Sequence, residues 1–324
     1  MVREMTQRAQ VLRSRWAASS VGLLLLLTAL ALACNVVRLQ RHRLERDFEG
    51  AGLAPEIVTR GDDRVHVWHG GTRETNKTPV LLLHGFGGGA IWQWGEQLPP
   101  LSADRWVVVP DLLWFGDSSS TRDDPSLEHQ VEAMVGVLDH EDLPQVDVVG
   151  ISYGGMVGYL LARQHGHRVR RLVLVDSPGG IYAPEDLELL LERFGVNSAA
   201  EIIIPEDEAG VRRLLELAYH DPPYTPDFVL RQVKAEMYDP YRQPQQALLE
   251  AVVSGRERYT GTHQLDVSVG LIWGEDDPVF PLSIARRISD TYDAPLHTLP
   301  QARHAPNLEY PEAFNRALLQ LLDG

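Results

Sequence analysis

The sequence predicts an α/β fold, in which a mostly parallel sheet carries helices on both faces and a helical cap is inserted into it. Two observations support this class. Short apolar runs alternate with longer stretches whose apolar residues recur at helical spacing, as in strands joined by crossover helices. The alternation stops between residues 181 and 262, where only helix-like segments occur, and it then resumes.

The strands expected in the sheet are short apolar runs that end at turns or polar loops. They are 65–68, 80–83, 106–109, 146–149, 172–175, 267–273 and 296–299. Core helices are expected at 127–138, 156–165, 284–292 and 311–322, and cap helices at 187–194, 211–218, 228–238 and 247–253. We therefore predict an α/β core formed by 62–178 and 263–324, and a helical cap formed by 179–262.

Composition limits the partners of the chain. Its 324 residues carry a net charge of −15, which argues against a nucleic-acid partner. The single cysteine, Cys34, excludes an internal disulfide, a cysteine nucleophile at the candidate site and a cysteine-based zinc site. We predict no metal, no cofactor and no obligate protein partner.

An uncharged apolar segment precedes the predicted core. Residues 16–37 contain no charged side chain, and about 20 apolar residues suffice to cross a bilayer as a helix. We predict a transmembrane signal anchor there, after a basic segment at 1–15 and before a tether at 38–61.

Two alternatives to the anchor remain open. One is a cleaved signal peptide with its cleavage site at 31–33, which would leave a secreted or periplasmic protein, and the other is a lipoprotein signal ending at Cys34. Arginines that follow the apolar run favour the anchor. Because equal numbers of arginines flank the run, the side of the membrane that the domain faces stays open.

The segment Gly150-Ile151-Ser152-Tyr153-Gly154-Gly155 lies between a predicted strand and a predicted helix. A Gly-x-Ser-x-Gly in this context is the pattern of a nucleophile elbow, in which small residues allow a turn so sharp that the serine is exposed. The same pattern also occurs in ordinary glycine-rich turns. The strand–turn–helix context favours Ser152 as a nucleophile.

A serine hydroxyl is a weak nucleophile and requires a base that is itself oriented by an acid. Residues that follow parallel strands meet at one edge of a sheet, and Asp277 and His304 both follow predicted strands. The order Ser…Asp…His is that of a hydrolase triad. We therefore predict Asp277 as the acid and His304 as the base, with Asp276 as the fallback acid and Asp176 as a less favoured position.

The segment His84-Gly85-Phe86-Gly87-Gly88-Gly89 follows the strand at 80–83. Glycines let a backbone approach a ligand closely, and no Lys-Ser/Thr follows to complete a phosphate-binding loop. We predict that the backbone N–H groups of Phe86 and Tyr153 form an oxyanion hole. His84 is expected to anchor its loop.

From about residue 65 to 322 the chain resembles the capped subgroup of the α/β-hydrolase fold family. The resemblance rests on His-Gly-Phe-Gly-Gly at 84–88, Pro-Asp-Leu-Leu-Trp-Phe-Gly-Asp-Ser at 110–118, Gly-Ile-Ser-Tyr-Gly-Gly at 150–155, Trp-Gly-Glu-Asp-Asp-Pro-Val-Phe-Pro at 273–281 and His-Ala-Pro-Asn-Leu-Glu at 304–309. The chain is similar to membrane-anchored monoacylglycerol lipases and to plant and bacterial hydrolases that carry Ile-Trp-Gln-Trp, here at 91–94. It departs from the family at Leu113 and Trp114, where Pro-Gly is usual, and at Arg303, where glycine is usual.

The resemblance implies a serine hydrolase that cleaves carboxylic esters through an acyl-enzyme, with acyl glycerols or similar lipid esters as substrates. A C–C bond hydrolase, a thioesterase or a cofactor-free haloperoxidase would use the same residues. A receptor that binds a ligand without turnover is a further alternative, since a fold does not fix a function. Epoxide hydrolases and haloalkane dehalogenases are disfavoured, because they require aspartate at the position of Ser152.

Overall fold

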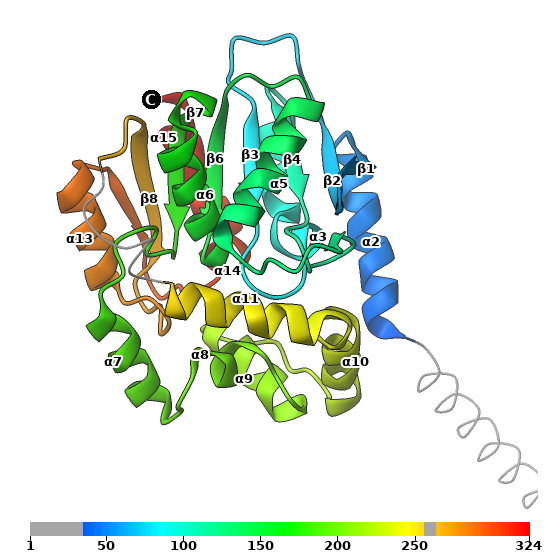
Figure 1. The fold of residues 1–324 in the computed structure, drawn as a ribbon, viewed down its shortest axis with the longest axis vertical. Helices are drawn as coiled ribbons and strands as arrows, with labels where there is room; N and C mark the ends of the chain where they lie inside the picture. The colour runs from blue at the N-terminus through cyan, green and yellow to red at the C-terminus, as the bar shows by residue number, and fades with distance from the viewer. Residues whose placement is uncertain (1–34, 256–263) are drawn as a thin grey trace, which may run out of the picture.

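The computed structural model describes residues 35–255 and 264–324, and its strands form one sheet (Figure 1). The sheet runs in the order β1-β2-β4-β3-β6-β7-β8-β9, and β5 pairs with β2. The strands are β1 Leu53–Arg60, β2 Asp63–Gly71, β3 Val80–Leu83, β4 Trp106–Pro110, β5 Ser119–Ser120, β6 Val146–Ile151, β7 Val169–Val175, β8 Ser268–Gly274 and β9 Leu296–Leu299.

Six neighbouring strands, from β4 through β9 in the order of the sheet, pair in parallel, while β1, β2 and β5 pair antiparallel. Alternate side chains of the central strands enter two different cores. In β3, Leu81 and Leu83 belong to one core, and Val80 and Leu82 belong to the other. A sheet that is apolar on both faces requires cover on both sides, and the predicted α/β class is confirmed.

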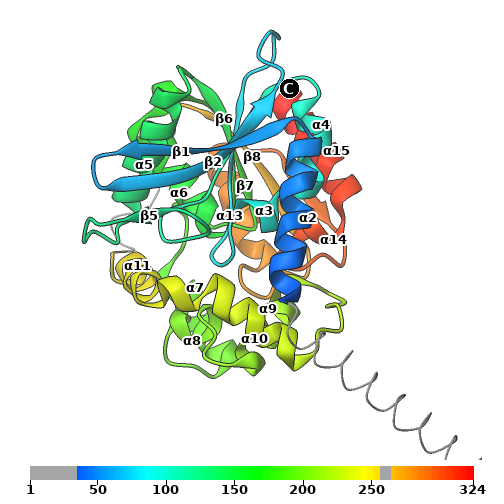
Figure 2. The same cartoon turned by 90° about the vertical axis from the view of Figure 1, so that its right-hand side faces the viewer.

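Helices cover the two faces of the sheet (Figure 2). The core on one face includes residues of α5 (Leu127–His140), α6 (Tyr153–Gln164) and α13 (Leu282–Tyr292). The core on the other face includes residues of α2 (Val36–Gly50), α3 (Ala90–Gln93), α4 (Leu98–Ser102) and α15 (Pro311–Asp323). A short helix, α14 (Pro306–Glu309), precedes α15.

The inserted cap consists of helices that lie together beyond one end of the central strands (Figure 1). They are α7 Pro184–Phe194, α8 Ala199–Ile203, α9 Glu208–Ala218, α10 Asp227–Met237 and α11 Arg242–Ser254. The sequence pattern predicts four of them. It misses α8, because one short turn of helix is too brief to show a periodic pattern. The end of the predicted cap, residues 256–262, lies outside the described residues.

The prediction of a tether at 38–61 is wrong, because these residues form most of α2 and all of β1. The whole of β1 pairs with β2, and the ring of Phe48 is fully buried against Trp68 at a centroid distance of 5.3 Å. Only Val37 and Phe48 of α2 are buried, so its apolar pattern is weak. Pro55 obscures β1, and a proline is tolerated there because β1 is an edge strand.

The predicted basic segment 1–15 and most of the predicted anchor at 16–37 lie outside the described residues. Val36 and Val37 begin α2, and the side chain of Asn35 caps this helix by accepting a hydrogen bond from the amide of Arg38. Within residues 35–255 and 264–324, no helix has the length and apolar character that crossing a membrane requires. The N-terminal anchor stays a prediction.

Candidate active site

Ser152 occupies the sharp turn between β6 and α6 with φ of 52° and ψ of −120°. A positive φ is costly for a side chain with a Cβ atom and persists only where the surroundings enforce it. Here they do: a Cβ on Gly154 would lie 2.4 Å from the Leu83 carbonyl oxygen, and the Ser177 hydroxyl donates to the Ser152 carbonyl at 2.6 Å. The glycine at 154 therefore allows the turn that exposes the Ser152 hydroxyl.

His304 joins the other two predicted triad residues. Its Nε2 lies 3.0 Å from the Ser152 Oγ, and its Nδ1 lies 2.9 Å from Oδ2 of Asp277. The Asp277 side chain is fully buried, and its Oδ1 accepts a hydrogen bond from the amide of Val279 at 2.7 Å. An imidazole that donates from Nδ1 to a carboxylate keeps Nε2 as the acceptor of the serine proton.

The two alternative acids, Asp276 and Asp176, form no hydrogen bond with His304 in the described structure. The side chain of Asp276 is exposed on the same loop. Asp176 is buried after β7, where its Oδ1 accepts a hydrogen bond from the amide of Gly274 at 2.9 Å. Burial, and after it the charge of Asp277, raises the pKa of Asp176 well above its ordinary value.

The two residues predicted to form the oxyanion hole line one pocket with Ser152. Tyr153 is the first residue of α6, so its amide points out of the positive end of the helix, as first-turn amides do. Phe86 lies in the loop after β3, and its ring packs edge to face on Tyr153 at 5.6 Å. The loop bends beside it at Gly87 and Gly88, which have φ of 101° and 68°.

Side chains beneath this glycine-rich loop fix its position. Asp111, buried after β4, accepts the amide of Ala90 at 2.7 Å through Oδ1, and its Oδ2 lies 3.0 Å from His66 Nδ1. Burial by itself raises the pKa of Asp111. The hydrogen bond and charge of His66, together with the charge of His84 and the amide of Asp117, outweigh burial, so the pKa of Asp111 is lowered. This role of Asp111 was not predicted from the sequence, because it depends on partners from other parts of the chain, Ala90 and His66.

His84 has the anchoring role expected for it. Its Nδ1–H donates to the carbonyl oxygen of Gly85 at 2.7 Å, and its Nε2 accepts the amide of Leu112 at 2.9 Å. Burial lowers the pKa of His84. A buried neutral imidazole with both nitrogens used in this way holds the loop in place.

The pocket above Ser152 is almost wholly apolar. Its walls come from the core and from the cap helices α7, α8 and α11. The lining residues are Phe86, Leu127, Ser152, Tyr153, Met156, Tyr159, Leu160, Gly179, Tyr182, Leu187, Leu190, Ala199, Ile203, Leu249, Val252, Val253, Val279 and Phe280. No charged side chain of the described residues lines it, so the pocket suits an uncharged apolar group.

Comparison with known proteins places the chain in a family. Residues 80–317 match the model of the Alpha/beta hydrolase family. The chain belongs to this family. Like other members, it carries the Ser–His–Asp arrangement at the ends of parallel strands.

Relatives within the α/β-hydrolase family differ in the reaction for which they are named. The chain is 28% identical over 250 residues to a 2-hydroxymuconate semialdehyde hydrolase from Pseudomonas sp. (strain CF600), covering 73% of this chain and 83% of the relative. It is 27% identical over 259 residues to Lipase 1 from Psychrobacter immobilis, covering 77% of this chain and 76% of that lipase. The crystal structure of a membrane phospholipase A shares the fold, with a TM-score of 0.77 and 24% identity over 96% of this chain and 98% of that one.

Arg303 is accommodated where the α/β-hydrolase family usually has glycine. The φ angle of Arg303 is not positive, so its backbone conformation does not require glycine. Its amide donates to Glu309 at 2.6 Å, and its guanidinium donates to the carbonyl of Glu216 in the cap. The adjacent amide of His304 donates to the Leu217 carbonyl at 3.3 Å. The histidine loop is thus bonded directly to α9.

The second departure from the family, at Leu113 and Trp114, also contacts the cap. Trp114 has φ of 65°, and its carbonyl accepts a hydrogen bond from Gln245 of α11 at 3.0 Å. Its ring packs edge to face on His129 at 5.6 Å. These contacts hold a non-glycine residue in the left-handed region and connect the loop after β4 to the cap.

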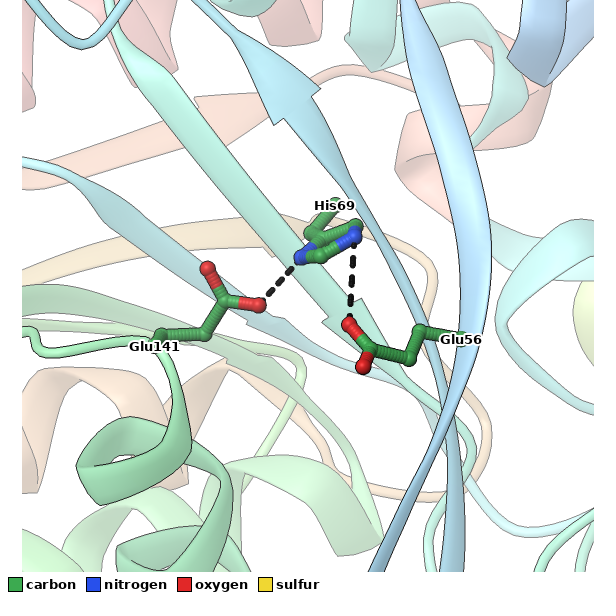
Figure 3. A group of neighbouring side chains, drawn as sticks. All are labelled: Glu56, His69 and Glu141. Atoms are coloured by element: carbon green, nitrogen blue, oxygen red, sulfur yellow. Dashed lines mark hydrogen bonds and ion pairs between the residues drawn. The ribbon is translucent and has the colours of Figure 1, made fainter.

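One group of side chains outside the pocket has the composition of a metal site (Figure 3). Glu56 and Glu141 face different ring nitrogens of His69, and Glu141 also accepts from Arg73 at 2.7 Å and from Trp106 at 3.0 Å. The two nitrogens of an imidazole point in different directions, so one ion cannot bind both. We assign this group a structural role, in which it ties β1 and β2 to the end of α5.

Proposed function

We propose that this α/β-hydrolase cleaves carboxylic esters that carry an apolar acyl group. One observation carries the proposal: His304 bridges Ser152 and Asp277 at 3.0 Å and 2.9 Å, and Ser152 lines a pocket that has no charged side chain of the described residues in its walls. The bridge supplies an activated nucleophile, and the pocket supplies a place for the acyl group.

In the proposed reaction, the Ser152 Oγ attacks the acyl carbon while His304 Nε2 takes its proton. Asp277 orients the imidazole and stabilises its positive charge, and the amides of Phe86 and Tyr153 stabilise the oxyanion. His304 then gives the proton to the departing alcohol. Water, activated by the same histidine, releases the acid from the acyl-enzyme, and the cycle requires no cofactor.

The named substrate of one relative provides a contrast. A 2-hydroxymuconate semialdehyde carries a carboxylate, and its hydrolysis breaks a C–C bond. An ionised carboxylate is costly to bury without a cation or several donors. Because no cationic side chain of the described residues lines the pocket, an apolar ester fits it better than such a substrate.

The lipid part of the proposal rests on two further features. The predicted anchor at 16–37 would hold the domain at a bilayer, where apolar esters concentrate. The motifs also resemble those of membrane-anchored monoacylglycerol lipases. We therefore propose a single-pass membrane protein that acts on acyl glycerols or related lipid esters.

A substrate panel tests this proposal. The full chain is assayed with monoacylglycerols, p-nitrophenyl esters, acyl thioesters and a 2-hydroxy-6-oxo-dienoate, with Ser152→Ala as the control. We expect turnover of the glycerides and apolar esters and none by the variant. Preferred turnover of the dienoate would replace the ester assignment with C–C bond hydrolysis. Tight ligand binding without turnover of any panel member would indicate a receptor.

A further inference from the structure

Asp176 is a buried acid that the proposed reaction does not use. It follows β7, its side chain is fully buried, and its φ of 40° places it among the strained non-glycine residues. Its Oδ1 accepts the amide of Gly274, but among the described residues no donor reaches its Oδ2. The neighbouring acid is Asp277 of the triad: the amide of Gly274 donates to Asp176, and the carbonyl of the same glycine accepts from the amide of Asp277 at 3.3 Å.

Two ionised carboxylates cannot satisfy each other, because both only accept hydrogen bonds. Placing both charges side by side in a buried site is also costly. A proton on Asp176 removes both problems, since the acid then donates an O–H to its neighbour. Burial and the charge of Asp277 raise the pKa of Asp176, and Glu309 of α14 acts in the same direction. No cation of the described residues bonds Asp176 to oppose this effect.

We propose that Asp176 is a positioning residue of the triad: it stays protonated and donates a hydrogen bond to Asp277. The proposal rests on the proposed role of Asp277 as the triad acid. With the Val279 amide and His304 Nδ1, this O–H would give the Asp277 carboxylate a third donor. The carboxylate is then fixed toward the imidazole from the side of the sheet.

The position of Asp176 suits this role. Its own amide donates to the Ile272 carbonyl in β8 at 3.2 Å, and its Oδ1 holds the amide of Gly274, where the loop of Asp277 begins. The next residue, Ser177, holds the carbonyl of Ser152. Asp176 therefore lies between the elbow that presents the nucleophile and the loop that presents the acid.

Kinetics of two substitutions test the donor role. In Asp176→Asn, the amide oxygen can still accept from Gly274 and the NH₂ can still donate to Asp277, whereas Asp176→Ala removes both bonds. We expect Ala to lower kcat on the order of 10- to 100-fold with little change in KM, and Asn to restore most of that loss. If Asn is as inactive as Asp277→Asn, Asp176 acts as an ionised acid and the proposal is wrong.

Thermal unfolding tests the proton itself and needs no substrate. An acid whose pKa is raised by folding binds more protons in the folded state, so it lowers stability progressively as pH rises above the unfolded value of about 3.9. We therefore expect Asp176→Asn to raise Tm at pH 8 by several degrees, with the gain shrinking toward pH 4.

Asp293→Asn is the matched control for this measurement, because Asp293 also has positive φ but is exposed. Its Tm difference from the wild type should not change with pH. A pH-independent difference for Asp176→Asn would overturn the proposal. A wild type that turns over no ester would instead remove the proposed function, while the unfolding data would still report on the proton of Asp176.

Discussion

His304 makes two hydrogen bonds that together determine the tautomer of its neutral ring. Because Nδ1 faces a fully buried carboxylate, the proton of the neutral ring lies on Nδ1, and Nε2 is left to accept from Ser152. A change that reverses this tautomer removes the base without moving any backbone. The chemistry of the site thus depends on which acid lies behind the ring.

Replacing that acid tests this dependence. We expect Asp277→Asn to lower kcat for ester hydrolysis by about 10⁴-fold, because an amide can donate to Nδ1 and so hold the ring in the wrong tautomer. Steady-state kinetics at neutral pH measure the loss. Asp276→Asn on the same loop is the matched control, and we expect its kcat to stay within about twofold of the wild type, since its side chain is exposed. If Asp276→Asn lost more activity than Asp277→Asn, Asp276 would be the acid of the triad and the assignment of Asp277 would be wrong.

At the scale of elements, the close packing of β6, α6 and β3 sets the position of the serine. A Cβ at 154 would meet the backbone oxygens of Leu83 and His84 at 2.4 Å, and neither atom can move without moving the sheet. The elbow is therefore a consequence of how near the helix approaches the sheet. A substitution that pushed α6 away from the sheet would therefore distort the turn at Ser152.

Gly154→Ala provides that push. We expect it to destabilise the fold by about 1–3 kcal/mol and to reduce ester turnover, because the elbow shifts away from its neighbours. Urea unfolding and turnover measure the two effects. Gly95→Ala is the control: its nearest contact would be Phe48 at 3.9 Å, so no clash arises. Equal, small effects of both substitutions would contradict the close approach.

The helix α2 and the strand β1 belong to the folded domain. Besides burying Phe48, α2 lies beside α10 of the cap (Figure 2). Asn35 and Arg38 both donate to Glu236 of α10 at 2.8 Å. The segment after the predicted anchor thus connects the sheet to the cap. It does not act as a spacer.

Phe48→Ala tests the place of this segment in the fold. Removing a fully buried ring should cost about 3–5 kcal/mol, measured by urea unfolding of the full chain. Leu39→Ala, on the same helix but 61% exposed, should change the free energy of unfolding by less than about 0.5 kcal/mol. A negligible effect of Phe48→Ala on the free energy of unfolding would instead support the prediction that residues 38–61 form a tether.

At the scale of the whole molecule, the cap and the core together enclose the pocket. Ala199 of α8 is a small residue on its wall, and Leu189 of α7 is an exposed residue outside it. Under the proposed function, the size of the wall residues would therefore limit the length of the acyl group that the pocket accepts.

Ala199→Phe should shorten the acyl chain that the pocket accepts. We expect kcat/KM for dodecanoyl esters to fall on the order of tenfold, with acetyl esters little affected, because the added ring fills space that only long chains occupy. Leu189→Phe should leave the ratio of the two unchanged. The same loss on both esters would show that the chain does not occupy this pocket.

Sequence periodicity and motifs predicted most of this architecture, and the reasons for the failures are physical. Strands such as 80–83 are apolar on both faces and stand out, whereas α2 buries only Val37 and Phe48 and leaves a polar pattern. Ser152, Asp277 and His304 were identifiable because each follows a strand. Asp111 and Asp176 also follow strands, but their roles depend on tertiary partners that spacing does not reveal.

In the proposed mechanism, Ser152 is a nucleophile that His304 activates. The most direct measurement is peptide mapping by mass spectrometry after reaction of the full chain with a fluorophosphonate. We predict one adduct on Ser152 that is absent from Ser152→Ala. In His304→Ala the adduct should form at a rate lower by a factor on the order of 10³ or more. Labelling of Ser152→Ala at the wild-type rate, or a wild type that does not react, would contradict this mechanism.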